Sequence, residues 1–229
     1  MKIGGLQRTS LSDYPGKISA IVFTQGCNFR CPYCHNPELV DPGKFGPLVP
    51  EGDFFAFLEK RQGKLDAVTV TGGEPTLQED LERFLSDIRK MGYHLKLDTN
   101  GSRPDVLESL IGRGLVDYFA MDIKGPFSKY NRIAGVSVAE NAIRKSIELI
   151  ATSGISHEFR TTIVRSQLDA DDLVSIVDLL KNTSLYVLQA FVPTKLLAAS
   201  FLSETTYSPD EFAVIRERLE KEGLRIAIR

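Results

Sequence analysis

Six short apolar segments rich in β-branched residues alternate with amphipathic segments along this chain of 229 residues. The apolar segments are residues 18–24, 67–71, 94–98, 116–121, 158–164 and 185–191. Between them, apolar positions three and four residues apart indicate helices. Because consecutive parallel strands need helical crossovers, the alternation predicts an α/β fold with a parallel sheet. Six units are too few for the eight-fold barrel, so we expect a partial barrel.

The chain is expected to form a single domain over residues 1–229, with a core at about 17–195. A helix and an edge strand are expected at about 208–229, the strand at 224–228. Capping boxes mark three helix starts. They are Thr76 with Glu79, Ser137 with Glu140, and Ser208 with Glu211.

Charge and hydropathy exclude several classes of protein. The 28 basic and 30 acidic residues leave a net charge of −2, which does not favour nucleic-acid binding. The N-terminus is too polar for a signal peptide, and no apolar run approaches the roughly 20 residues of a membrane span. We therefore expect a cytoplasmic protein with no nucleic-acid or membrane partner.

All three cysteines, Cys27, Cys31 and Cys34, lie within eight residues in a C-x3-C-x2-C pattern. An odd number in one cluster is not a disulfide framework and indicates a metal or cluster site. Zinc with His35 as fourth ligand and haem c attachment both remain open from this pattern. Three protein ligands and one open position are typical of a catalytic metal.

Further polar motifs follow the other expected strands. The sequence Gly-Gly-Glu-Pro at 72–75 follows the second strand, Asp-Thr-Asn-Gly at 98–101 ends the third, and Asp-Ile-Lys at 122–124 follows the fourth. Barrel and doubly wound α/β folds carry their chemistry at the C-terminal ends of their strands. These motifs and the cysteines therefore predict one functional edge.

The cysteine spacing after the first strand, with Tyr33 before the third cysteine, resembles the signature of radical S-adenosylmethionine (SAM) enzymes. The stretches 12–16, 31–37 and 97–101 are similar to those of glycyl-radical-enzyme activases. The likeness is greatest to the activating proteins of anaerobic ribonucleoside-triphosphate reductase and less to the pyruvate formate-lyase activases. It covers residues 5–195.

This resemblance implies one 4Fe–4S cluster per chain, with Cys27, Cys31 and Cys34 on three irons and SAM on the fourth. It implies reductive cleavage of SAM to a 5′-deoxyadenosyl radical, which forms a glycyl radical on a partner enzyme. Anaerobic ribonucleotide reductase is the expected partner, and a reduced flavodoxin or ferredoxin the expected electron donor. Pyruvate formate-lyase is an alternative partner.

For SAM, the resemblance implies that the backbone of Gly72 and Gly73 approaches the methionyl ammonium, where a Cβ would obstruct it. Glu74 and Asp98 offer acceptors for that cation. A simpler reading of the Gly-Gly-Glu-Pro stretch is a turn before the next helix.

Asp122 and Lys124 lie on one side of an extended segment and are expected at the two ribose hydroxyls; an ordinary ion pair is the simpler reading. Tyr33 is expected near the adenine, or in the core. In the related pyruvate formate-lyase activases, residues matching Asp98, Thr99 and Asp122 line a small site for a monovalent cation, and we expect the same here.

Expectations for three further side chains follow from their positions in the sequence. His35 is expected to be structural, while Arg160 and Gln189 lie on late strands near the functional edge. Two other functions remain open: radical SAM chemistry on a small molecule or peptide, and a non-enzymatic iron–sulfur electron carrier or zinc module.

Overall fold

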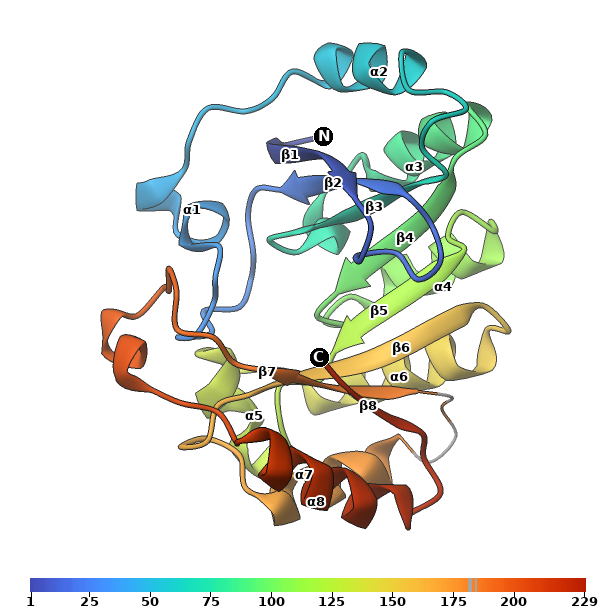
Figure 1. Cartoon of the computed structure of the whole chain (residues 1–229). Coiled ribbons are helices and arrows are strands. Elements are labelled where there is room, and N and C mark those ends of the chain that lie inside the picture. The colour runs from blue at the N-terminus through green and yellow to red at the C-terminus, as the bar shows by residue number, and fades with distance from the viewer. Residues whose placement is uncertain (181–182, 184) are drawn as a thin grey trace. The chain divides into compact units, whose positions relative to one another are not determined.

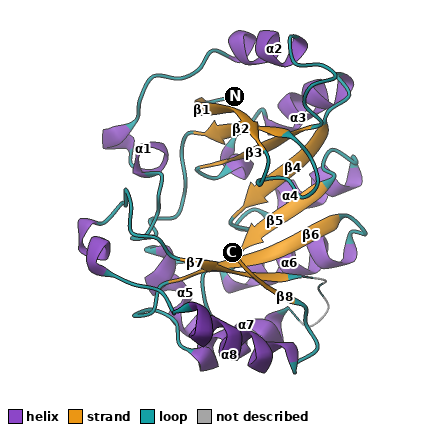
Figure 2. Cartoon of the chain, in the orientation of Figure 1, coloured by secondary structure: helices purple, strands orange, loops and turns teal. Residues whose placement is uncertain are grey.

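The computed structural model describes residues 1–180, 183 and 185–229. The chain divides into two compact units. Unit 1 holds Met1–Asn28, Asn36–Thr99 and Arg103–Phe119, and unit 2 holds Phe29–His35, Asn100–Ser102 and Ala120–Arg229. Over the described residues the strands follow chain order, β1 to β8, in an open sheet (Figure 2). This open order, largely parallel, confirms the expected fold class.

Unit 1 contains β1 (Ile3–Ser10), β2 (Ser19–Thr24), β3 (Ala67–Gly72) and β4 (His94–Thr99). β1 is antiparallel to β2, whereas β2, β3 and β4 are parallel neighbours. Its helices are α1 (Pro37–Val40), α2 (Glu51–Glu59), α3 (Leu81–Lys90) and α4 (Pro104–Gly112), with 3₁₀ turns η1 (Pro42–Lys44) and η2 (Pro75–Leu77). α3 packs against β4 (Figure 1).

Alternation along β2, β3 and β4 explains the core of unit 1, because successive side chains of a strand point to opposite faces. One face is apolar and fully buried: Ala20, Val22, Val68, Val70, Leu95 and Leu97. The other face carries Thr69, Lys96 and Asp98, which are also buried. The second face is therefore polar although it is shielded from water.

Unit 2 contains the end of β5 (Tyr118–Asp122), then β6 (Ser156–Ile163), β7 (Tyr186–Ala190) and β8 (Ile226–Ile228). β6, β7 and β8 are parallel neighbours. The helices are α5 (Phe127–Ala134), α6 (Glu140–Thr152), α7 (Ala170–Leu179) and α8 (Pro209–Glu220), with the 3₁₀ turn η3 (Ala199–Ser203). α8 packs against α7 and β8 (Figure 1).

The structure confirms the edge strand at the end of the chain and adds a strand that the sequence pattern does not reveal. β8 lies within the expected segment 224–228 and pairs with β7. β1 was not expected, because two adjacent glycines and a polar half leave it without the alternation of a half-buried strand.

One of the three expected capping boxes is confirmed. Ser208 caps α8, with Glu211 completing the box. The box at Thr76 is wrong. Thr76 lies inside η2, its hydroxyl donates to Glu74, and α3 begins only at Leu81. The box at Ser137 is also wrong, because α6 has Ala139 at its N-cap.

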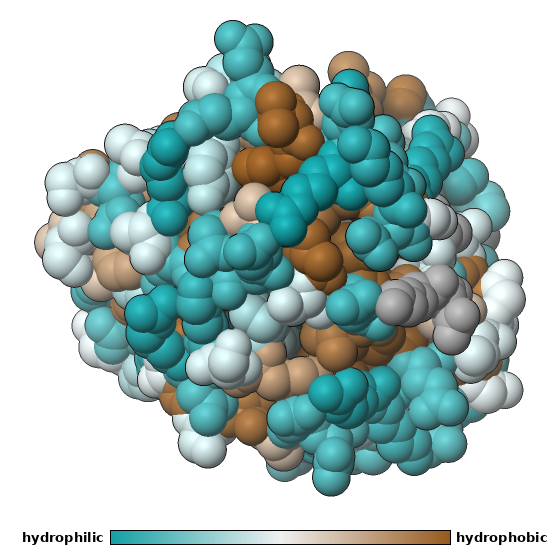
Figure 3. All heavy atoms as spheres, turned by 90° about the horizontal axis from the view of Figure 1, so that it is seen from below, coloured by the Kyte–Doolittle hydropathy of each residue, from teal (hydrophilic) through white to brown (hydrophobic). Residues whose placement is uncertain are grey.

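Seen from below, most of the visible surface is hydrophilic, with strips of apolar atoms between the polar side chains (Figure 3). In the described part of the chain, the helices are too short or too polar to cross a lipid bilayer.

Candidate functional site

In unit 1, the register of the parallel strands brings the expected motifs to one edge. Thr24 of β2 lies beside Gly72 of β3, and Val70 of β3 lies beside Leu97 of β4. The loop that leads to Cys27, the Gly-Gly-Glu segment and the end of β4 therefore start side by side, as the sequence predicts.

The Gly-Gly-Glu segment is fastened to the loop before Cys27. The Gly73 amide donates to the Thr24 carbonyl, and the Glu74 amide donates to the Gly26 carbonyl, both at 2.8 Å. A Cβ on Gly73 would lie 2.7 Å from the carbonyl carbon of Gly26 and closer still to its oxygen. A Cβ on Gly72, at φ +108°, would lie 2.8 Å from the carbonyl carbon of Phe23. The structure thus gives these glycines a packing role against the chain itself; their approach to SAM stays a prediction.

The Glu74 carboxylate is a buried hub, with the residue only 1% exposed. Its Oε1 accepts from the Thr76 amide at 3.1 Å and hydroxyl at 2.6 Å, and from the Thr99 hydroxyl at 2.8 Å. Glu74 therefore ties the ends of β3 and β4 together, whatever ligand it also meets.

Asp98, the other expected acceptor, faces a cation that belongs to the protein. The Lys96 ammonium donates to Asp98 Oδ1 at 2.6 Å and lies 3.6 Å from Asp13 Oδ2. An internal ammonium thus stands at this carboxylate, and the structure gives no support to the expected monovalent cation near Asp98, Thr99 and Asp122.

In unit 2, the second half of the cysteine loop is held by the chain after β7. The Leu197 amide donates to the Cys34 carbonyl at 2.9 Å, and the Ala198 amide donates to the Pro32 carbonyl at 3.0 Å. His35 contacts the Val192 carbonyl through Nε2 at 2.8 Å, which agrees with a structural role.

The segment just before Cys31 is held by the end of α5. The Arg30 amide donates to the Ala134 carbonyl at 2.8 Å. Gly135, at φ +69°, follows the helix and has no room for a Cβ, which would lie 2.8 Å from the Arg30 carbonyl carbon. The sequence analysis missed this glycine, although a glycine just after a helix is a common termination signal.

Asp122 and Lys124 form a cluster with Arg160 of β6. Lys124 Nζ lies 3.2 Å from Asp122 Oδ2, while Nε and Nη2 of Arg160 lie 3.0 Å from Oδ1. Burial alone raises the pKa of Asp122, but Arg160 and Lys124 outweigh it and lower the pKa to about 2. Burial opposes the charge of Lys124 too, yet Asp122 raises the pKa of this amine well above its usual value. The cluster is therefore charged, with two cations around one carboxylate, and places Arg160 beside the two expected residues.

Two buried tyrosines lie near this cluster. Tyr33 is 4% exposed and Tyr130 of α5 is 2% exposed. Among the described residues, neither hydroxyl has a hydrogen-bond partner. Burial raises the pKa of both phenols, and Lys124 offsets part of that rise. Tyr33 is thus buried, and its approach to the adenine stays a prediction. Tyr130 is a polar group that the sequence analysis missed.

None of the three cysteines is part of a disulfide: Cys31 is buried, while Cys27 and Cys34 are half-buried. Burial raises the pKa of Cys31, although the charge of Lys124 lowers it in part. In the described part of the chain, no three side chains of the His, Cys, Asp and Glu types are gathered as a ready metal site. The donors themselves fit an iron–sulfur cluster, which takes thiolate ligands.

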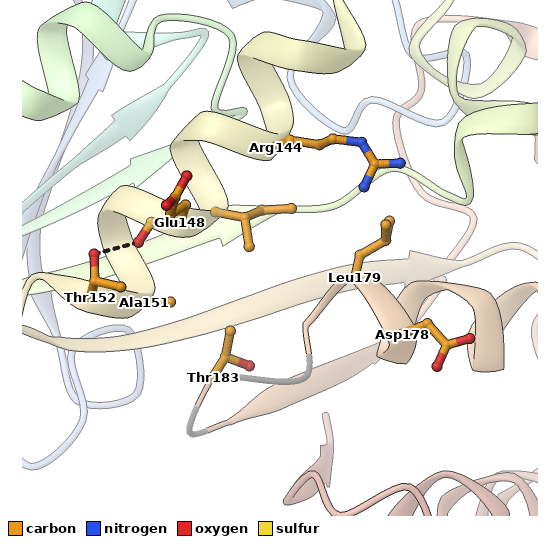
Figure 4. A pocket seen from close by; sticks show the side chains of 8 residues that line it. Arg144, Glu148, Ala151, Thr152, Asp178, Leu179 and Thr183 are labelled. Atoms are coloured by element: carbon orange, nitrogen blue, oxygen red, sulfur yellow. Dashed lines mark hydrogen bonds between the residues drawn. The ribbon is translucent and has the colours of Figure 1, made fainter.

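A cavity of about 290 Å³ lies between α6 and α7, away from these residues (Figure 4). Its charged lining consists of Arg144, Glu148 and Asp178, and the Thr152 hydroxyl donates to the Glu148 carbonyl at 2.7 Å. Arg144 is already paired with Glu140. None of the predicted site residues lines this cavity.

Comparison with known proteins assigns the family. The profile of the Radical SAM superfamily matches residues 21–180. A Methanocaldococcus jannaschii protein whose name assigns it as a glycyl-radical enzyme activating enzyme is 38% identical over 200 residues, covering 83% of this chain and 80% of the relative. The pyruvate formate-lyase-activating enzyme of Clostridium pasteurianum is 28% identical, covering 79% of this chain and 76% of that enzyme.

Among solved structures, Streptococcus suis SuiB matches with a TM-score of 0.71 at 15% identity, over 91% of this chain. The match spans only 48% of the SuiB chain, about half its length, and supports the fold alone. SuiB has also been solved with S-adenosylmethionine bound. By its profile match and its relatives, the chain belongs to the radical SAM superfamily and is homologous to its glycyl-radical enzyme activating enzymes.

Proposed function

We propose that the chain is a radical SAM activase that generates a glycyl radical on a partner enzyme. The observation that carries this proposal is the cysteine loop itself. Its three cysteines form no disulfide, and backbone hydrogen bonds fasten its first part within unit 1 and its second part within unit 2. A loop fastened in this way fixes the backbone that carries the three thiol donors.

Cys27, Cys31 and Cys34 would hold the 4Fe–4S cluster. When bound, the cluster and SAM supply one-electron cleavage of the sulfonium and hydrogen-atom abstraction. In unit 1, Glu74 and Asp98 would accept from the SAM ammonium. Because both carboxylates are buried and already oriented by protein donors, little reorganisation is needed on binding.

In unit 2, we expect Asp122 and Lys124 at two ribose hydroxyls, the carboxylate as acceptor and the ammonium as donor. Arg160, which donates to Asp122 Oδ1, would orient that carboxylate. Tyr33 would pack near the adenine. Since the match to the family profile runs through both units, we treat residues 1–229 as one functional domain.

The proposed partner is a glycyl radical enzyme, with anaerobic ribonucleotide reductase as the first candidate and pyruvate formate-lyase as the second. The names of the two relatives support the class of partner rather than the choice between them. A reduced flavodoxin or ferredoxin would supply the electron. Three cysteines without a disulfide favour a reducing compartment, so we place the reaction in the cytoplasm.

Anaerobic electron paramagnetic resonance tests this function. The cluster-reconstituted protein is mixed with SAM, a reductant and either the host's anaerobic ribonucleotide reductase or its pyruvate formate-lyase. A glycyl doublet with one partner is expected, and Cys31→Ala should abolish it. Ser137→Ala, at an exposed position, is the control and should leave the doublet unchanged.

The outcomes separate the competing functions. Accumulation of 5′-deoxyadenosine without a doublet would keep radical SAM chemistry but point to a small molecule or peptide as substrate. The absence of both the glycyl doublet and 5′-deoxyadenosine from a protein with an intact cluster would contradict the proposal and favour an electron carrier.

A further inference from the structure

Lys96 is a charged side chain in a place where the fold does not require one. It lies in the middle of β4 and is 1% exposed. Parallel strands buried on both faces usually carry apolar residues. Burying an ammonium costs free energy unless it is paired and hydrogen-bonded, so this lysine needs a specific reason.

The surroundings of Lys96 are polar and incompletely hydrogen-bonded. Lys96 and Asp98 are two residues apart and share a face of β4, and the register places Thr69 of β3 beside Lys96. In the described part of the chain, Asp13 Oδ2 and Thr69 Oγ1 are buried and have no hydrogen-bond partner. The ammonium has three N–H groups, one of which is given to Asp98.

Two roles for Lys96 are possible in principle. In a structural role, it joins β4 to the segment around Asp13, and the contact at 3.6 Å would matter most. In a positioning role, the hydrogen bond of 2.6 Å to Asp98 matters most. The shorter contact is the charge-assisted hydrogen bond, and Asp98 is at the edge where the site motifs meet.

We propose that Lys96 is a positioning residue whose buried ammonium serves as a built-in cation for Asp98. It holds Asp98 Oδ1 with a charge-assisted hydrogen bond and so fixes the orientation of the carboxylate that is to receive a ligand ammonium. This role rests on the proposed function, in which Asp98 receives the ammonium of SAM.

Lys96→Ala removes the cation and leaves space for a small amine. We measure the dissociation constant of SAM for the anaerobic, cluster-reconstituted protein by equilibrium dialysis, with and without propylammonium chloride. Roughly tenfold weaker binding is expected, because Asp98 loses its fixed donor. Propylammonium should restore most of the affinity of the variant and leave the wild type unchanged.

Two further variants separate positioning from structure. Asp13→Asn weakens the longer contact only, so SAM should bind it as it binds the wild type. Lys129→Ala removes a lysine paired with Asp169 and Asp172 in unit 2, and is the matched control for loss of an ion pair. It should show neither weaker binding nor an effect of the amine. If Lys96→Ala does not fold, Lys96→Met keeps the aliphatic volume and should show the same loss without rescue.

The result that overturns the positioning role is wild-type affinity for SAM in a folded Lys96→Ala protein. Loss of affinity in Asp13→Asn equal to that in Lys96→Ala would likewise overturn it and assign a structural role. Failure of the wild-type holoenzyme to bind SAM would instead refute the proposed function. Thermal unfolding of the cluster-free Lys96→Ala protein would then still test the lysine, since propylammonium should raise the midpoint of this variant alone.

Discussion

Replacing Gly73 by alanine should separate two loops that the structure holds together. The backbone of Gly73 is not in the left-handed region, so alanine introduces no conformational strain of its own. The added Cβ would lie 2.7 Å from the Gly26 carbonyl carbon, whereas ordinary contacts begin near 3.4 Å. Because the obstacle is backbone, it has no side-chain rotation with which to move away.

The magnitude follows from the contacts that must yield. Relief of the overlap needs a displacement of at least about 0.7 Å, because the Gly26 oxygen lies closer than the carbonyl carbon. That is enough to break two backbone hydrogen bonds of 2.8 Å, from Gly73 to Thr24 and from Glu74 to Gly26. Each contributes roughly 0.5–1.5 kcal/mol, so the variant should lose about 1–3 kcal/mol of unfolding free energy. Cys27 directly follows Gly26, so the displaced loop should also bind less iron.

Urea denaturation of the cluster-free protein measures the stability, and iron analysis after anaerobic reconstitution measures cluster loading. Gly46→Ala is the matched control, since its Cβ meets nothing within 4 Å and its backbone is unstrained. Both substitutions lower the conformational entropy of the unfolded chain equally. The difference in unfolding free energy between the two variants therefore measures the effect of the overlap. Equal stability and equal iron content in the two variants would refute the close packing of Gly73 on Gly26 as the contact that holds these loops together.

Two further predictions concern charge and capping. Asp122 has a folded-state pKa lowered to about 2, against about 4 when unfolded, because two neighbouring cations outweigh its burial. Its contribution, at most about 3 kcal/mol, is present above pH 4 and is lost as the pH falls to 2. Asp122→Asn should flatten this part of the pH profile of unfolding free energy, and an unchanged slope would contradict the pairing. Ser208→Ala should lower the unfolding free energy by about 1 kcal/mol in urea denaturation, because Ser208 caps α8. Ser137→Ala should leave it nearly unchanged, because Ser137 caps no helix. Equal losses in the two variants would contradict the capping assignment.

Local signals predicted much of the architecture. Strands began and ended within about two residues of the apolar runs, because alternation and flanking glycines act over a few residues. The same logic failed for β1, which is a strand because it pairs with β2 and shows no strand pattern of its own. It also failed at Thr76, where a hydrogen bond to Glu74 replaced the expected helix cap.

The sequence by itself determined the cysteine spacing, the family likeness and the placement of polar motifs at strand ends. These are properties of neighbouring residues, and chain order preserves them. Only the tertiary structure decided that Gly73 packs on Gly26 and that Lys96 turns inward to Asp98. Lys96 reads as an exposed lysine in sequence, and its burial depends on which face of β4 is shielded by strands and loops far away in the chain.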